Sequence, residues 1–143
     1  MSLVVDASVA IAWCFGDEQT PALMALLDRV GEDGAEAPSP WPLEVAKTLV
    51  LAKRRKHAGA EAVEDLLGFP RDLPVRLDAS TATQAWGATA LLAERHRLRV
   101  YDAVHLELAL RCDLSVAMLD KTRQRRPLGR GAGVGGWLAA STA

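Results

Sequence analysis

Four acidic residues interrupt short apolar runs along this 143-residue chain, and together they have the chemistry of a metal site. They are Asp6, Glu44, Asp102 and Asp120, in the phrases LVVDASVAIAW, PLEVAKTLVLA, VYDAVHLELAL and VAMLDK. If the fold brings them together, their oxygens suit Mg²⁺ or Mn²⁺, which proteins often hold with carboxylates, waters and substrate phosphate. Such a site can activate a water and stabilise the leaving oxygen during phosphodiester hydrolysis.

Each acid also has an explanation that involves no metal. Asp6, Asp102 and Asp120 each precede a helical pattern, and Asp is a favoured N-cap whose charge stabilises a helix N-terminus. Glu44 is compatible with a solvent-facing glutamate on a helix. In one pocket, however, two carboxylates ~5 Å apart would repel by roughly 3 kcal/mol at an effective dielectric near 20. A bound cation or raised pKa values would relieve this repulsion, so convergence of the four favours a metal site.

The elements that must position these acids alternate along the chain. Strands are predicted at 3–5, 35–37, 75–77 and 115–119, and helices from 8, at 20–30, 41–56, 60–69, 80–96 and 101–112. This alternation predicts an α/β fold with a mostly parallel sheet. Ligands bind such sheets beyond the carboxyl ends of the strands. Asp6 and Asp120 each follow an apolar strand by one residue, so we expect both at the same edge of the sheet.

Composition predicts an ordinary soluble globular protein, and the length fits a single domain over residues 1–143. Half of the residues are apolar, a quarter are charged and the formal net charge is −1, so only local patches could attract nucleic acid. No apolar stretch approaches 18 residues without charge, which predicts no membrane span. Residues 1–15 lack the basic region of a signal peptide, so we expect a cytoplasmic protein.

The cysteines, histidines and glycines do not indicate another class of site. Cys14 and Cys112 lie in apolar helical stretches and are expected to be buried, reduced thiols. No C-x-x-C or H-x-x-x-H pair is present, so a zinc site is not expected. The G-x-G-x-x-G run at Gly131–Gly136 is rejected as a dinucleotide motif, because no convincing strand precedes it and only seven residues follow.

Four phrases, in this order and at this spacing, resemble the motifs of the PIN-domain family and, in style, the VapC toxins of bacterial toxin–antitoxin pairs. They are DASV, WPLEVA, RVYDAVHLELA and AMLDK, and they cover nearly the whole chain. The resemblance implies a three-layer α/β/α fold and a Mg²⁺- or Mn²⁺-dependent endoribonuclease. The positions that match the family's acidic quartet are Asp6, Glu44, Asp102 and Asp120, and Ser8 matches its small hydroxyl residue beside the metal. A homodimer is also implied, with a cognate antitoxin whose C-terminal segment blocks the active groove.

Two features depart from the family's pattern. Family members usually have Asn three residues after the helical glutamate, where this chain has Lys47. Lys47 shares a helical face with Glu44. Three interpretations remain open: it binds a substrate phosphate, it partly replaces cation charge, or it is a solvated lysine on a helix edge. Family members usually form a helix after the last acid, which Pro127 and Gly129 would break here. The geometry beyond Arg126 is therefore left open.

Three basic clusters provide the local charge that an RNA backbone needs: Lys53–Lys56, Arg95–Arg99 and Lys121–Arg126. The first two lie at predicted helix C-termini, where basic residues are favoured in any case. The third follows the last acid directly, which makes Lys121 and Arg123 the preferred phosphate contacts.

His105 lies three residues after Asp102, on the same predicted helical face. Two interpretations remain open: a contact to a substrate phosphate or to a metal-bound water, and a helix-surface or structural histidine, which is favoured. We do not assign it as a general base.

The sequence therefore predicts a toxin that hydrolyses single-stranded RNA with a metal-activated water. A catalytically weakened PIN-like binding module is the first alternative, and Lys47 motivates it. A receiver-like phosphoacceptor domain is the second. It is less favoured, because receivers usually carry adjacent acids after the first strand and Asp6 is followed by Ala7.

Overall fold

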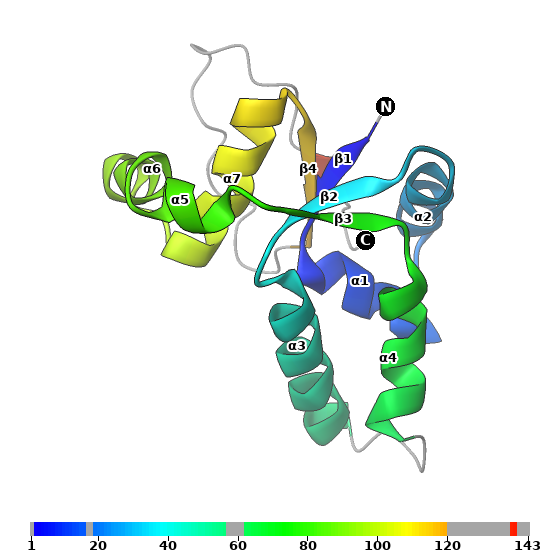
Figure 1. Ribbon diagram of the computed structural model, residues 1–143. Helices are drawn as coiled ribbons and strands as arrows, with labels where there is room; N and C mark the ends of the chain where they lie inside the picture. The colour runs from blue at the N-terminus through cyan, green and yellow to red at the C-terminus, as the bar shows by residue number, and fades with distance from the viewer. Residues whose placement is uncertain (1, 17–18, 57–61, 120–137, 140–143) are drawn as a thin grey trace.

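The computed structural model describes residues 2–16, 19–56, 62–119 and 138–139, which build a parallel sheet with helices on both faces. The strands are β1 (Leu3–Val5), β2 (Ala35–Pro38), β3 (Val75–Asp78), β4 (Ser115–Met118) and β5 (Leu138–Ala139). Their order across the sheet is β3-β2-β1-β4-β5, and each pair of neighbours is parallel (Figure 1). The predicted α/β class and parallel sheet are confirmed.

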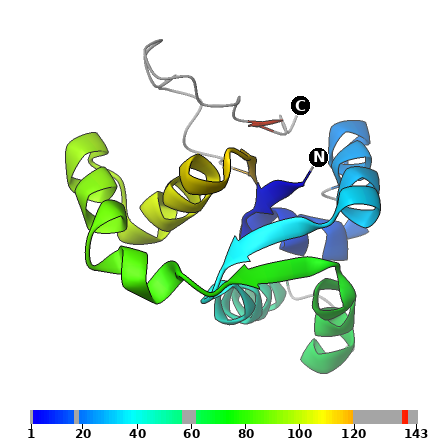
Figure 2. The same cartoon turned by 45° about the horizontal axis from the view of Figure 1, so that its top comes forward.

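Seven helices of the described residues form the outer layers. They are α1 (Ala7–Cys14), α2 (Pro21–Asp33), α3 (Trp41–Lys56), α4 (Val63–Asp72), α5 (Thr81–Ala85), α6 (Ala88–His96) and α7 (Val100–Cys112). Helices α1 to α4 lie on one side of the sheet and α5 to α7 on the other, which gives the predicted three layers (Figures 1 and 2).

The central strand β1 is apolar throughout because both of its faces are covered. Leu3 and Val5 pack into the larger core beneath α1, α2 and α3, while Val4 packs against Leu108 of α7 on the other face. All three β1 side chains are fully buried. Continuous apolar runs of this kind are typical of parallel strands that are buried on both faces.

The sheet has its topological switch point beside β1. After β1 the chain adds β2 and β3 on one side, and later adds β4 and β5 on the other. Connections that leave in opposite directions open a crevice at the carboxyl ends of the two central strands. The backbone N–H of Asp6 still donates to the carbonyl of Ala117 at 3.0 Å, so Asp6 lies at the end of β1 beside β4. This position directs its side chain to the crevice.

Three helix predictions need correction. The helix predicted at 20–30 continues to Asp33, and its C-cap is Gly34, whose φ of 73° suits glycine. The stretch 80–96, predicted as one helix, forms α5 and α6, because Gly87 has φ −137° and ψ −97°, outside the helical region. Glycine has a low helix propensity and no side chain to hold it in register. The helix predicted to end at Pro70 continues to Asp72. The φ of proline suits a helix, and this close to the end its missing N–H removes little hydrogen bonding.

The two cysteines are free thiols in different environments. Cys14 is half-buried in α1, and burial raises the pKa of its thiol to about 11. Cys112 is exposed, which corrects the prediction of a buried thiol; it is the last residue of α7 and is followed by the left-handed C-cap Asp113. An apolar helical sequence therefore does not ensure burial in its last turn.

The C-terminal part of the chain lies mostly outside the described residues. The rejected glycine motif at Gly131–Gly136 and the departures at Pro127 and Gly129 are among the positions that are not described. The described piece, β5, pairs with β4 and is a strand that the sequence did not predict. None of the described helices is long and apolar enough to cross a membrane.

Candidate metal centre

Asp6 is held at the end of β1 by a small hydrogen-bond network with Ser8. The backbone of Asp6 is extended and caps α1, and its Oδ2 accepts from the Ser8 N–H at 3.3 Å and from the Ser8 hydroxyl at 2.5 Å. The Ser8 oxygen in turn accepts from the N–H of Leu119 at 3.1 Å, just beyond β4. The network uses one oxygen of Asp6, and the other, Oδ1, faces α7. The cap interpretation and the site interpretation of Asp6 are therefore compatible.

Glu44 reaches the same place from the first turn of α3. Its Oε2 is buried and has no hydrogen-bond partner among the described residues. Burial raises the pKa of its carboxyl, and the charges of Asp6 and Asp102 raise it further, whereas His105 and Lys47 act in the opposite direction. Glu44 thus has the environment that suits a metal ligand.

His105 is the buried histidine of this cluster. Its side chain is 2% exposed, which rules out a histidine on the helix surface and leaves open both a structural role and a contact to the site. Its Nδ1 lies 2.7 Å from the carbonyl oxygen of Tyr101. Its Nε2 lies 3.4 Å from Asp6 Oδ1 and 3.9 Å from Glu44 Oε2, and no described residue forms a hydrogen bond with it.

Asp102 approaches from the first turn of α7 without capping it. The N-cap is Arg99, whose Nε donates to Asp102 Oδ2 at 2.9 Å. The carboxylate of Asp102 is near enough to raise the pKa of Glu44, and its side chain is 15% exposed. Asp102 therefore belongs to the acidic environment of the cluster, while Arg99 offsets part of its charge.

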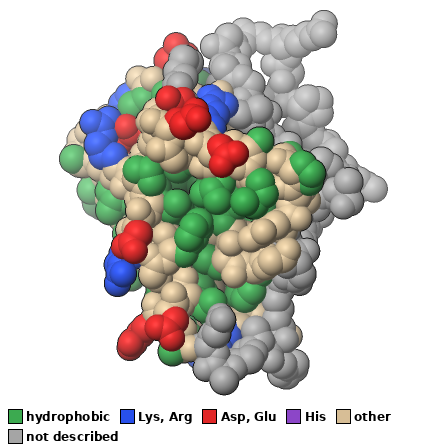
Figure 3. Space-filling view, turned by 90° about the vertical axis from the view of Figure 1, so that its right-hand side faces the viewer, with side chains coloured by type: hydrophobic (Ala, Val, Ile, Leu, Met, Phe, Trp, Pro, Cys, Tyr) green, Lys and Arg blue, Asp and Glu red, His purple; other side chains and the backbone are tan. Residues whose placement is uncertain are grey.

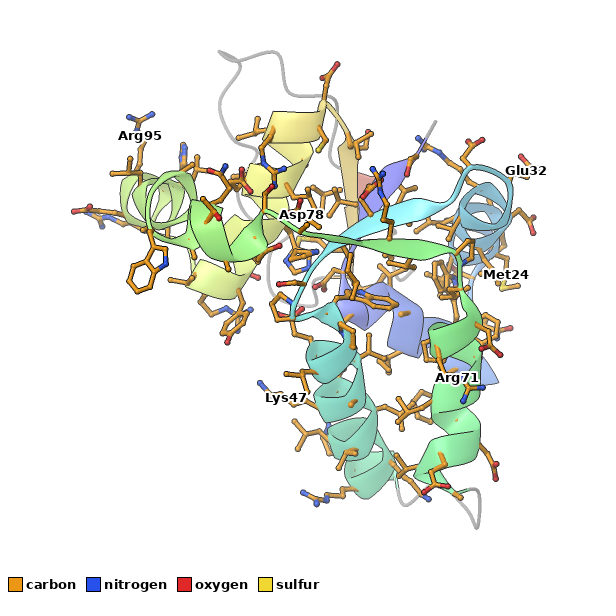
Figure 4. All side chains as sticks on the ribbon, viewed as in Figure 1. Met24, Glu32, Lys47, Arg71, Asp78 and Arg95 are labelled. Carbon is orange, nitrogen blue, oxygen red and sulfur yellow. The ribbon has the colours of Figure 1, made fainter. Side chains whose placement is uncertain are left out.

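The remaining predicted site residues are placed differently. Asp120, Lys121 and Arg123 lie outside the described residues. Lys47 is exposed one turn after Glu44 on α3 and points outward (Figure 4). Lys53 follows Glu44 by nine residues, which is about 13 Å along the helix.

The second basic cluster lies on the opposite side of the sheet from α3. Arg95 points away from the body of the protein at the end of α6 (Figure 4). Arg99 is bonded to Asp102. Among the described basic residues, Lys47 and Arg99 are thus the ones with a charge that acts at the cluster.

The geometry of Asp6, Glu44 and His105 fits a divalent cation. One ligand atom from each lies within 4.8 Å of the other two. In an octahedral site with bonds of ~2.1 Å, neighbouring ligand atoms are about 3 Å apart and opposite ones about 4.2 Å. The separations of 3.4 Å and 3.9 Å from His105 Nε2 fall within that span. Two buried polar atoms without partners also call for a group that would satisfy them.

The PIN-domain family model matches residues 3–127, a span that contains all four predicted acids. The chain belongs to the PIN-domain family. PIN domains are generally nucleases that use divalent metals. The cluster of Asp6, Glu44 and His105, which could hold such a metal, is consistent with this family activity. Membership in the family also removes the receiver-like alternative. No curated protein matches the chain significantly.

His105 is the residue of this centre whose role was hardest to predict from the sequence. Two signals could have ranked it higher. It lies one helical turn from Asp102, and most of its neighbours are apolar, which predicts the buried stretch that the structure shows at Ala103–Ala109. A helix that is buried all round leaves a polar ring no route to solvent, so the ring must have a buried partner.

We expect Glu44→Gln to stabilise the metal-free protein above the raised pKa of Glu44. The pKa of this carboxyl is higher in the folded protein than in the unfolded chain. The protonated carboxyl therefore contributes stability below its unfolded pKa, and this contribution is lost as pH rises through the raised pKa of the folded protein. Gln keeps the shape and removes the charge. In chelator at pH 8, the melting temperature of the variant should therefore exceed that of the unmodified protein by a few degrees.

The advantage of Glu44→Gln should disappear in acid, and Mn²⁺ should reverse it, because only the intact site gains stability from the cation. Glu94→Gln, on an exposed residue of α6, is the matched control and should change neither result. A variant less stable than the unmodified protein in chelator at pH 8 would contradict the electrostatic argument.

Proposed function

We propose that this PIN domain is a Mg²⁺- or Mn²⁺-dependent endoribonuclease and the toxin of a type II toxin–antitoxin pair. The observation that carries the proposal is the convergence of Asp6, Glu44 and His105 at the switch point of the sheet, where two buried atoms have no hydrogen-bond partner among the described residues. Asp102 adds a further carboxylate from α7, and we assign Asp120, which follows β4 in the sequence, as the fourth acid of the centre.

Each residue has a defined part in this proposal. A bound divalent cation would lower the pKa of an attacking water and stabilise charge on the leaving oxygen. Asp6 is kept in place for binding by Ser8, which joins the ends of β1 and β4. Glu44 and Asp102 supply negative charge from two helices on opposite sides of the sheet.

Phosphates of the RNA require cationic contacts outside the acid cluster. Lys47 is exposed beside Glu44, and we assign it, with Lys121 and Arg123, to the substrate backbone. His105 does not fit a phosphate contact as well, because it is buried. The substrate class is therefore a single-stranded RNA that is recognised chiefly through its backbone.

A homodimer and a cognate antitoxin are the protein partners that we propose. Support comes from apolar side chains that are exposed on the surface of the protein. Hydrophobic side chains gather over the face bordered by α2 and α4 (Figure 3). Large hydrophobic residues are also exposed on α5 to α7, with Trp86 91% and Tyr101 64% exposed.

The test is cleavage of single-stranded RNA by the purified protein with Mg²⁺ or Mn²⁺, before and after chelation. We expect internal cuts that require the cation and return when it is restored. Cleavage that continues unchanged in chelator would refute the metal-dependent mechanism. Growth arrest on expression, relieved by a co-expressed partner, tests the toxin assignment separately.

One observation favours a second candidate, a binding module with little catalysis. The charge of Lys47 acts on Glu44, as a partial substitute for a cation would. If this substitution were complete, the unmodified protein would bind neither Mg²⁺ nor Mn²⁺. Tight Mn²⁺ binding measured by calorimetry would remove this candidate.

We expect Lys47→Asn to raise Mn²⁺ affinity by roughly threefold at neutral pH and low salt, since an exposed charge of this kind contributes less than about 1 kcal/mol. The gain should shrink at high ionic strength, because Lys47 is exposed and its charge is screened. RNA affinity should fall in the same variant. Calorimetry at two salt concentrations measures the first effect, and Arg54→Asn, on an exposed residue further along α3, is the control. Unchanged Mn²⁺ affinity in Lys47→Asn would mean that this lysine is simply solvated.

A further inference from the structure

The Nε2 atom of His105 is the least expected feature of the acid cluster. Carboxylate oxygens alone would make a site for hard cations, but this centre also presents an imidazole nitrogen. The nitrogen is aimed at Asp6 Oδ1 and Glu44 Oε2, at 3.4 Å and 3.9 Å, from a side chain that is 2% exposed. Within the part of the chain that the structure describes, this nitrogen has no hydrogen-bond partner.

The hydrogen bond at the other ring nitrogen determines what Nε2 can do. The carbonyl oxygen of Tyr101 can only accept, so the Nδ1 that lies 2.7 Å from it must carry the proton. In neutral imidazole, Nε2 then has a lone pair and no proton. A lone pair directed at two carboxylates is repelled by them, and either a metal cation or a further proton between them would relieve this repulsion. Metal-binding histidines commonly have this arrangement, with one nitrogen fixed by a backbone carbonyl and the other free to bind.

We infer that His105 binds the metal directly through Nε2 and shifts the preference of the centre from Mg²⁺ toward Mn²⁺. This inference rests on the proposed metal centre and adds to it a ligand that is not a carboxylate. Mg²⁺ prefers oxygen ligands and gives up its waters reluctantly, whereas imidazole nitrogen suits transition metals. Of the two proposed cations, Mn²⁺ is the one that gains more from a nitrogen ligand.

Other groups near the ring do not provide an alternative partner for Nε2. Asp6 Oδ2 is engaged by Ser8, and Asp102 is bonded to Arg99. Lys47 is exposed and carries the same sign of charge as a metal. The competing arrangement is a doubly protonated ring that bridges Asp6 and Glu44 without any metal–nitrogen bond. The two arrangements differ in whether a bound Mn²⁺ has nitrogen in its coordination sphere.

Pulsed electron paramagnetic resonance of the Mn²⁺-loaded full chain distinguishes them. A directly bound imidazole gives ¹⁴N modulation of the Mn²⁺ echo, and this signal should be present in the unmodified protein. It should change to the ¹⁵N pattern when the protein is made with [¹⁵N]histidine. It should persist in His57→Gln and His96→Gln, and disappear in His105→Gln. If His105→Gln does not fold, labelling and the two control variants still assign the ligand by elimination.

Calorimetry with Mg²⁺ and Mn²⁺ separately measures the preference. We expect the ratio of Mn²⁺ to Mg²⁺ affinity to fall by at least roughly tenfold in His105→Gln and to stay constant in His96→Gln. If Mn²⁺ binds but its echo shows no modulation by histidine nitrogen, the inference is overturned and the proposed nuclease activity is not affected. The same holds if the modulation persists in His105→Gln. Failure of the protein to bind either cation would overturn both.

Discussion

Asp6→Asn should reduce metal-dependent RNA cleavage by about a hundredfold or more while the protein remains folded. Asp6 contributes a carboxylate oxygen to the cluster, and this oxygen lies near the ligand atoms of both Glu44 and His105. An amide in its place keeps the size of the side chain and removes the charge that holds a divalent cation. The loss should appear both in cleavage rate and in Mn²⁺ affinity measured by calorimetry.

The fold should tolerate this change because Asn can replace Asp6 as the N-cap of α1. Asn and Asp are about equally good N-caps, so the bond from the Ser8 N–H to a side-chain oxygen can persist at the start of α1. Circular dichroism and the melting temperature in chelator should therefore change little. A loss of cleavage with an unchanged melting curve would assign the effect to the site.

Asp28→Asn is the matched control for this experiment. Asp28 is exposed on α2, and the substitution has the same chemistry as at position 6. Cleavage by this variant should equal that of the unmodified protein. Equal cleavage by Asp6→Asn would instead show that the activity comes from a contaminating ribonuclease.

The fold was predictable from the sequence because local signals and tertiary structure agree in most elements. Continuous apolar runs such as Leu3–Val5 are buried on both faces, and the acid that ends this run follows at the edge of the sheet. The break at Gly87 was missed because the helical pattern continues on both sides of a single glycine. Strand β5 was missed because two residues carry no periodicity; pairing with β4 makes them a strand.

The site was only partly predictable, because a sequence shows which residues end elements but not which atoms meet. Asp6 and Glu44 were selected by their apolar flanks, and the structure brings both to His105. The importance of His105 depends on the direction of its ring, which the hydrogen bond to Tyr101 sets. That bond joins residues four apart in α7, and nothing in their types predicts it. The pairing of Glu107 with Asp78 through Arg111 was likewise missed, because it links residues far apart in the chain.

The second large effect concerns stability and arises at Arg111, which holds α7 to the end of β3. Its Nε donates to Glu107 Oε1 at 2.8 Å, and its Nη2 donates to Asp78 Oδ2 at 2.7 Å. Glu107 is 4% exposed, so its carboxylate depends on this one guanidinium. Asp78 also accepts from the N–H of Ser80 and from Thr81 at the start of α5. Arg111 therefore connects the layer of α5 to α7 to the end of β3.

Arg111→Met should lower the free energy of unfolding by roughly 2–3 kcal/mol. Removing one partner of a buried ion pair leaves an uncompensated buried charge, and the estimate is below the range for fully buried pairs because the Arg111 side chain is 30% exposed. Urea unfolding followed by circular dichroism measures the difference. Arg71→Met is the matched control, since Arg71 and Asp72 form a pair that is 75% and 72% exposed and should contribute little.

The loss in Arg111→Met should also depend on pH. Burial by itself would raise the pKa of Asp78, but hydrogen bonds from Arg111, Ser80 and Thr81 outweigh burial and lower it. A lowered carboxyl pKa contributes stability that is present above the unfolded pKa and is lost as pH falls through the folded pKa. The difference between the unmodified protein and Arg111→Met should therefore be largest near neutral pH and shrink in acid. A difference that stays constant down to pH ~3 would mean that Arg111 stabilises the protein by packing and not by its charge.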